Sequence, residues 1–207
     1  MHAVRLIVAG GDAPDCLDLE RHYESIIAAD SGYDTALRLG LEPDLVVGDL
    51  DSTGCRDELI KKGAKPVSHD KDCTDLELAM FKGSGPYDLI GCGGGRLDHT
   101  LAALASFRKF GGPETWWTHE EVVYKVNGPV RIKAPSVLTF AFFTLTPEPV
   151  KVHSHGLVWE LDGFPLSLLN VSISNRSREA EVRLLPEGEI YMSIPLRFFP
   201  VEITEDA

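Results

Sequence analysis

The sequence contains no long apolar run, and this absence limits where the protein can act. No stretch approaches the ~20 apolar residues that a membrane-spanning helix requires. The apolar residues 4–9 are too few for the core of a signal peptide and run directly into Gly10 and Gly11. We therefore expect a cytoplasmic protein that does not enter a membrane.

Cysteine is scarce and irregularly spaced. The four cysteines form no CxxC pair and have no histidines at zinc-ligand spacing. Packing as reduced thiols explains them best, as expected for a cytoplasmic protein.

Positive charge is also in short supply. Only 20 lysines and arginines face 32 aspartates and glutamates, which gives a formal net charge of −12. Nucleic acids and anionic membranes select basic patches, so we expect neither as a partner. An anionic substrate would need metal ions and a few local arginines or lysines to offset this charge, whereas a cationic substrate would be attracted directly.

The hydrophobic patterning divides the chain near residue 120. Before this point, short apolar runs alternate with segments of helical spacing, which is typical of a parallel sheet covered by helices. The expected strands are 4–9, 25–29, 45–47, 64–67, 87–91 and 115–118. The expected helices are 33–39, 57–62, 75–82 and 97–110.

Beyond residue 120 the helical spacing disappears, and proline, glycine or asparagine separates short apolar runs. This pattern is typical of an antiparallel sandwich or barrel. The expected strands are 122–126, 130–132, 137–145, 150–153, 157–161, 166–173, 181–184 and 190–194. We therefore predict an α/β fold with an N-terminal parallel-sheet domain over residues 1–120 and an all-β sandwich domain over residues 121–207.

Aspartates follow two of the expected parallel strands. Asp30 comes directly after 25–29, and Asp49 and Asp51 come after 45–47. Parallel strands present ligand sites at their carboxyl ends, and an extended backbone would project Asp49 and Asp51 to the same side. Gathered carboxylates repel one another, so we expect Mg²⁺ and a phosphate ligand between them. A DxDS turn that caps a following helix is the alternative.

Residues 71–77 form a second acidic block. Thr74 and Glu77 have the spacing of a capping box, which would start a helix. This leaves Lys71, Asp72 and Asp75 unexplained. An acid in the first turn, such as Asp75, commonly serves the helix dipole, yet either aspartate could complete a metal shell.

The block GCGGGRLDH, residues 91–99, carries the strongest single signal. Its glycines expose backbone N–H groups near a helix start, which favours phosphate binding, and Arg96 adds a permanently charged donor fork. Neither the P-loop nor the dinucleotide pattern matches. Asp98 could orient a substrate hydroxyl, bind a cationic ring or cap the helix, and helix-start packing explains His99 about as well as catalysis does.

With these blocks in order, the chain resembles the thiamine pyrophosphokinase family. The motifs ADSG, PDxxxGDxDS, DxTDxE, GGRxDH and SxSN occupy residues 29–32, 43–52, 72–77, 94–99 and 172–175. The resemblance implies a nucleotide-binding α/β domain before a β-sandwich, a homodimer, and transfer of the pyrophosphoryl group of ATP to the hydroxyl of thiamine, leaving AMP. The chain departs from the family before Gly156 and at Trp159, where members usually have tyrosine.

The resemblance also assigns roles to individual residues. Mg²⁺ would be held by Asp49, Asp51 and Asp75, which with Asp98 form the catalytic set. ATP and its phosphates would contact Asp30, Ser31, Gly32, Lys71, Asp72, Gly94, Gly95 and Arg96. Thiamine would contact Asp98, His99, Trp159, Ser174 and Asn175.

Three other functions stay open from the sequence. A pyrophosphokinase acting on a pterin alcohol would share the first domain but leaves the second, with its SISN, unexplained. A nucleotide-sugar transferase would use Asp49 and Asp51 as its DxD motif but does not require GGRLDH. A thiamine- or nucleotide-binding module without turnover is disfavoured by the complete set of acidic residues.

Overall fold

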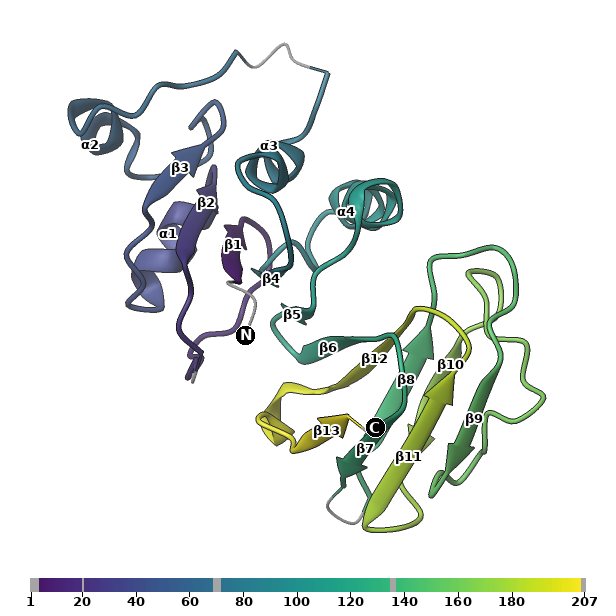
Figure 1. Ribbon diagram of the computed structural model, residues 1–207. Coiled ribbons are helices and arrows are strands. Elements are labelled where there is room, and N and C mark those ends of the chain that lie inside the picture. Colours follow the sequence, from purple (N-terminus) through teal and green to yellow (C-terminus); the bar gives the residue numbers. More distant parts are fainter. Residues whose placement is uncertain (1–3, 20, 69–71, 135–136, 206–207) are drawn as a thin grey trace. The chain divides into compact units, whose positions relative to one another are not determined.

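The structure is a computed structural model that describes residues 4–19, 21–68, 72–134 and 137–205 (Figure 1). Contacts divide the chain into two units, Met1–His119 and Glu120–Ala207.

The first unit is built on a parallel sheet. Its spatial order is β3 (Leu45–Val47), β2 (Ser25–Ala29), β1 (Arg5–Ala9), β4 (Tyr87–Ile90) and β5 (Thr115–Trp117), with every neighbouring pair parallel. The inner strands β1 and β4 are buried along their whole length, which explains their nearly continuous apolar sequences. The parallel pairing predicted for this part is confirmed.

Among the described residues, four helices follow the strands of this sheet: α1 (Gly32–Arg38), α2 (Arg56–Lys61), α3 (Asp75–Phe81) and α4 (Leu97–Phe110). Each begins within one residue of its predicted start. The capping box of Thr74 and Glu77 is present at α3. The longest of them, α4, ends at Phe110 and is capped by Gly111, whose φ of 93° favours glycine.

The strand predicted at 64–67 is wrong. These residues, all of them described, form an irregular segment in which Val67 donates one backbone hydrogen bond to Gly48 at 2.9 Å. Pro66 has no N–H to give to a ladder, and residues 65–68 are exposed, so little burial favours a strand.

The second unit consists mainly of antiparallel strands. One set pairs in the order β6 (Glu121–Val126), β12 (Ile190–Pro195), β8 (Thr139–Phe143) and β10 (Ser172–Arg176). The other pairs in the order β13 (Ile203–Glu205), β7 (Val130–Lys133), β11 (Glu181–Pro186) and β9 (Val152–His155). A short 3-10 helix, Leu196–Phe198, follows β12.

Burial alternates along β7, β8 and β11, as the predicted sandwich requires. Two strand predictions differ most from the structure. Residues 157–161, which are all described, contribute only an isolated bridge at Leu157, and β10 begins at Ser172 rather than at 166. The short β13 was not predicted.

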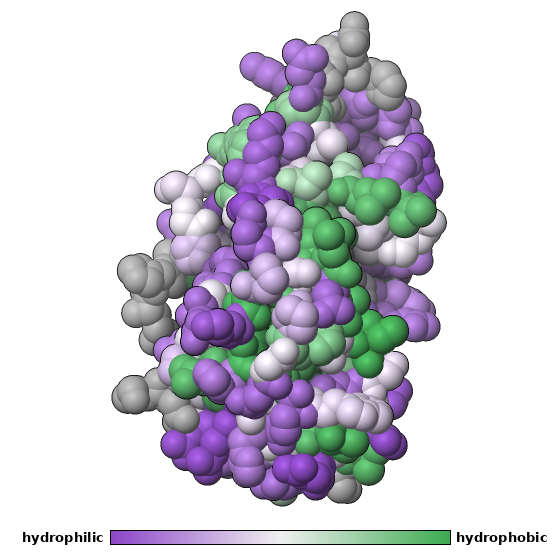
Figure 2. Space-filling view, turned by 90° about the vertical axis from the view of Figure 1, so that its right-hand side faces the viewer, coloured by the Kyte–Doolittle hydropathy of each residue, from purple (hydrophilic) through white to green (hydrophobic). Residues whose placement is uncertain are grey.

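The surface mixes hydrophilic side chains with scattered apolar ones on the face that Figure 2 shows. Within the described ranges, the helices are all too short or too polar to cross a bilayer.

Candidate active site

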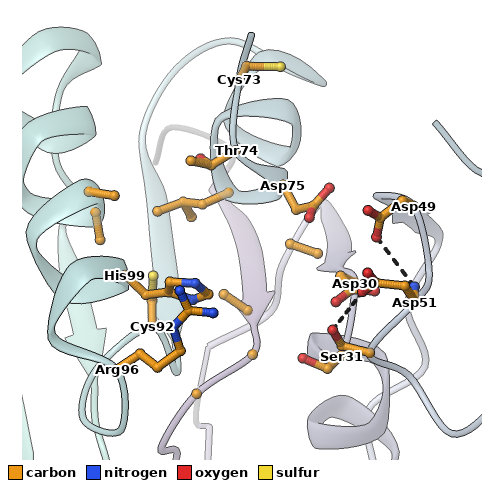
Figure 3. Close-up of a pocket in the computed structure, with 18 residues that line it drawn as sticks. Asp30, Ser31, Asp49, Asp51, Cys73, Thr74, Asp75, Cys92, Arg96 and His99 are labelled. Carbon is orange, nitrogen blue, oxygen red and sulfur yellow. Dashed lines mark hydrogen bonds between the residues drawn. The ribbon is translucent and has the colours of Figure 1, made fainter. Parts of the chain in front are cut away.

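A cavity of about 430 Å³ opens at the carboxyl edge of the parallel sheet. Residues that follow β1, β2, β3 and β4 line it, together with the beginnings of α3 and α4. Figure 3 shows a group of aspartates on one side of this cavity, with Arg96 and His99 on the other. The convergence that the sequence predicted at this edge is therefore present.

Asp30 follows β2 directly and has a left-handed conformation, with φ of 48°. Burial raises the pKa of its carboxyl, and the negative charge of Asp75 adds to this, while hydrogen bonds from Ser31 and Ser52 oppose it. The Oδ1 atom of Asp30 is buried and has no hydrogen-bond partner within the described part of the chain. A bound cation would satisfy this orphaned oxygen.

Residues 48–52 turn sharply after β3. Leu50 has φ of 60°, and its side chain is 1% exposed, packed with Ala28, Tyr33 and Leu59. The extended backbone expected around Leu50 is therefore wrong, because Leu50 turns inward in the left-handed region. Asp49 and Asp51 still meet, and the Asp51 N–H donates to Asp49 Oδ1 at 3.3 Å.

Three carboxylates gather closely enough to share one ion. One oxygen each from Asp30, Asp49 and Asp51 lies within 4.8 Å of the others. Asp49 is buried, Asp30 is half-buried and Asp51 is exposed, so solvent can complete a coordination shell. Carboxylate oxygens in this arrangement, one of them orphaned, fit a hard cation such as Mg²⁺.

Asp75 lies beside this group. A Cβ atom placed on Gly48 would lie 2.8 Å from Asp75 Oδ1 and 3.1 Å from Asp30 Cβ, so glycine keeps open the gap between these side chains. In Figure 3 the Asp75 carboxylate points from the start of α3 toward the other aspartates. Asp30 thus belongs to the close set with Asp49 and Asp51, and metal binding by Asp75, which the resemblance implies, stays a prediction.

The other residues of the acidic block differ in position. Asp72 is exposed and is not among the described residues that line the cavity, whereas Cys73, Thr74 and Asp75 are. Lys71 lies outside the described residues.

The glycine blocks bring two loops together backbone to backbone. The Cys92 N–H donates to the Gly10 carbonyl at 2.8 Å, and the Asp12 N–H donates to the Gly93 carbonyl at 2.8 Å. A Cβ atom on Gly94 would collide with the Asp12 carboxylate. Close loop packing therefore explains part of the glycine signal.

Only some residues of these glycine-rich blocks line the cavity. It includes Gly10, Gly11 and Cys92, but within the described residues it does not include Gly94, Gly95 or Gly32. Phosphate contacts by these three glycines stay predictions.

Arg96 and His99 line the cavity at the start of α4. Arg96 donates from Nε and Nη2 to the two carboxylate oxygens of Asp98, at 3.1 and 2.5 Å. This pairing lowers the pKa of the Asp98 carboxyl, although both side chains are exposed. Asp98 itself is absent from the described lining, so in this structure its carboxylate holds the Arg96 fork.

Two of the predicted thiamine residues of the second unit, Trp159 and Asn175, are hydrogen-bonded to each other. Asn175 is 1% exposed, and its amide accepts from the Trp159 N–H at 3.3 Å and donates to the Trp159 carbonyl at 2.7 Å. It therefore fixes the loop that carries Trp159 and is not presented to solvent. Trp159 is exposed, with the Arg176 guanidinium 5.4 Å from its ring centroid. Ser174 is exposed, with φ of 56°.

Several lining residues were missed by the sequence argument. Ser31 and Asp30 line the cavity as expected, but Ser52 also does, and its Oγ donates to Asp51 Oδ1 at 2.7 Å. Its place in the DxDS motif was the available signal. Cys73 and Cys92 also line the cavity, and no spacing pattern pointed to them.

The parallel sheet has an acidic cavity at the carboxyl ends of its strands, where a cation would fit. Doubly wound α/β proteins bind their ligands at this position, and the first unit has this architecture. Residues 17–115 match the family model described as thiamin pyrophosphokinase, catalytic domain. Residues 17–115 therefore carry the catalytic-domain signature of the thiamin pyrophosphokinase family.

Solved structures share the fold along most of the chain. A thiamin pyrophosphokinase family protein from Enterococcus faecalis has a TM-score of 0.73 at 22% identity, covering 93% of this chain and 99% of that one. Thiamine pyrophosphokinase from Bacillus subtilis gives 0.71 at 23% identity, covering 93% and 98%. The yeast enzyme gives 0.68 at 14% identity, covering 93% and 86%. No curated protein matches the chain.

Proposed function

We propose that this protein transfers the pyrophosphoryl group of ATP to the hydroxyl of thiamine, giving thiamine diphosphate and AMP. The family match supports this reaction. The observation that carries it at the level of the site is the orphaned Asp30 Oδ1 within a close set of three carboxylates, across the cavity from Arg96.

Asp30, Asp49 and Asp51 are the residues that would hold Mg²⁺, with Asp75 beside them. The bound ion would bring ATP to this acidic edge and neutralise charge that develops on the phosphate oxygens. Its presence would also relieve the repulsion among the carboxylates, because each would face a cation instead of another anion.

The chain supplies further positive charge through Arg96. Its guanidinium can donate to phosphate oxygens on the side of the cavity away from the aspartates. Asp98 holds this fork in place, at the cost of partly neutralising it. Gly10 and Gly11 line the cavity without side chains, which leaves room for a phosphate chain.

The thiazolium cation of thiamine suits a protein with a net charge of −12. We assign its recognition in the second unit to Trp159 and Ser174, with Asn175 holding the Trp159 loop. The Arg176 guanidinium already lies over the Trp159 ring, so stacking of the vitamin on that face would require Arg176 to move.

We further propose that the protein acts in the cytoplasm as a homodimer. Its four cysteines are free thiols, which agrees with a reducing compartment. Exposed apolar side chains on and before β10, including Leu169 and Ile173, offer a surface that a second copy could cover.

One assay tests the proposed reaction. Incubation with Mg²⁺, ATP and thiamine should yield AMP and thiamine diphosphate in equal amounts, measured by chromatography. A pterin alcohol and a sugar nucleotide serve as competing substrates. Product from either of these and none from thiamine would refute the proposal.

The variant Asp51→Asn tests the metal assignment within the same assay. Loss of one charged ligand should lower turnover by ~100-fold or more. Mutation of residues that only hydrogen-bond to metal ligands already lowers metal affinity or activity by about 10–100-fold. Asp18→Asn is the matched control, since Asp18 is exposed, lies outside the described cavity lining and has no predicted role in the site. Near-normal turnover of Asp51→Asn would contradict the assignment.

A further inference from the structure

Two helices that carry opposite sides of the cavity are joined by side chains. Asp75 begins α3, and Arg96 precedes α4. Ser106 Oγ on α4 donates to Glu77 Oε1 on α3 at 3.1 Å. At the far ends of the same helices, the rings of Phe81 and Phe110 meet edge to face, with centroids 4.9 Å apart.

Glu77 uses both carboxylate oxygens. Oε2 accepts from the Thr74 N–H at 2.9 Å, which completes the capping box of α3. A capping box needs only this one oxygen. The second oxygen is therefore available to Ser106, which lies 29 residues further along the chain and is 3% exposed.

The Ser106 hydroxyl has one proton and two acceptors within reach. Its Oγ lies 3.1 Å from Glu77 Oε1 and 2.9 Å from the Ala102 carbonyl on its own helix. The carboxylate is the stronger acceptor, because hydrogen bonds to a charged group are stronger than those between neutral groups. The proton therefore links the two helices, and the Ala102 carbonyl would accept it if Glu77 were absent.

We propose that Glu77 and Ser106 are positioning residues for the reaction. Glu77 fixes the first turn of α3, and with it Asp75, while Ser106 ties that turn to the helix that follows Arg96. The bridge thereby sets the separation between the metal-binding side and the phosphate-binding side of the cavity. This inference rests on the proposed function, because a displacement of about 1 Å can cost 10²-fold in rate only where the two sides act on one substrate.

The test compares three single variants. Ser106→Ala removes the bridge and leaves the capping box, so kcat should fall about tenfold or more. Glu77→Gln keeps an oxygen for Thr74 and offers an N–H to Ser106, so it should keep most of the wild-type kcat. Phe110→Leu loosens the same two helices far from the cavity, so it should lower the unfolding midpoint and leave kcat unchanged.

The readouts separate positioning from stability. We measure kcat, KM for ATP and the urea midpoint for every variant. A Ser106→Ala protein with a lowered midpoint and wild-type kcat would show a purely structural contact and overturn the inference. Equal losses of kcat in Ser106→Ala and Phe110→Leu would also overturn it.

Failure of the proposed function is distinguishable. If the wild-type protein forms no thiamine diphosphate, the proposed function fails, and binding of ATP with Mg²⁺ is then measured by calorimetry. Weaker binding to Ser106→Ala, with Glu77→Gln unchanged, would still support the bridge as a positioning device. Equal ATP affinity of the wild-type protein, Ser106→Ala and Glu77→Gln would refute the positioning role.

Discussion

At the scale of single residues, the acidic site depends on backbone conformations that most side chains avoid. Asp30, Leu50 and Cys92 all have positive φ, and each follows or interrupts the end of a strand at the cavity. Such conformations cost about 1–3 kcal/mol each and persist where surrounding packing enforces them. Leu50 shows the enforcement most clearly, because its buried side chain anchors the turn between Asp49 and Asp51.

Leu50→Ala should therefore affect both stability and activity. Removing a fully buried leucine should lower the free energy of unfolding by about 2–4 kcal/mol, as measured by urea denaturation. It should also raise the Mg²⁺ concentration needed for half-maximal activity, because Asp49 and Asp51 lose their anchor. Leu59→Ala in the same cluster is the control and should change only stability. Identical Mg²⁺ dependence of the two variants would contradict the anchoring role.

Gly48 is a second residue at which conformation and site geometry meet. Its φ is 124°, and an added Cβ would press on the Asp75 carboxylate. We expect Gly48→Ala to reduce turnover at least ~10-fold, because a small misplacement of reacting groups is costly. Gly63→Ala is the matched control, since Gly63 has φ of 94° but open space around its Cα. Wild-type turnover of Gly48→Ala would contradict the prediction, and an equal loss of turnover in Gly63→Ala would show that backbone strain alone is responsible.

The buried carboxyl of Asp30 predicts a pH-dependent cost. Burial raises its pKa above the ordinary value of 3.8, so the folded protein binds a proton more readily than the unfolded chain. Stability therefore falls as pH rises from 3.8 through the folded pKa, and the ionised group is a net cost above that range.

Asp30→Asn removes this cost. Without divalent metal, the variant should unfold at a higher temperature than wild type at pH 7, and the difference should vanish near pH 3, where both side chains are neutral. Calorimetric melting at both pH values in EDTA checks this. A variant that melts lower than wild type at pH 7 would show that hydrogen bonds to the Asp30 carboxylate outweigh its desolvation.

At the scale of elements, local signals predicted the helices well and the strands unevenly. α3 was recognisable because Thr74 and Glu77 carry the capping signal within four residues. The segment 64–67 is not a strand because Val67 is exposed, Ala64 is only partly buried and Pro66 interrupts pairing. Short strands such as β13 depend on partners far away in the sequence, and spacing alone does not reveal them.

The candidate site could also be predicted only in part. Strand-end aspartates could be predicted, because parallel topology alone brings such positions to one edge. How closely Asp30, Asp49 and Asp51 approach one another could not be predicted, because it depends on left-handed turns at Asp30 and Leu50 that motif spacing does not reveal. The pairing of Asp98 with Arg96 and the burial of Asn175 likewise depend on side-chain geometry rather than on motif spacing.

At the scale of the whole molecule, exposed apolar side chains and net charge have opposite effects on association. The second unit buries alternate side chains along β7, β8 and β11, yet Leu169 and Ile173 remain 87% and 72% exposed. Apolar side chains this exposed favour association, because covering them contributes roughly 25 cal/mol per Å². The net charge of −12 opposes association of two identical chains, so a dimer should strengthen as salt rises.

Leu169→Glu should therefore weaken the proposed homodimer. The substitution replaces an apolar contact with a charge in each copy, and both charges would be buried without partners. Sedimentation velocity should show a dimer for the wild-type protein and a shift toward monomer for the variant. Leu185→Glu is the control, because Leu185 is also exposed but lies on β11. If both variants stay dimeric, or if the wild-type protein is a monomer at high salt, a second copy does not cover this surface, and the exposed residues around β10 must be explained within one chain.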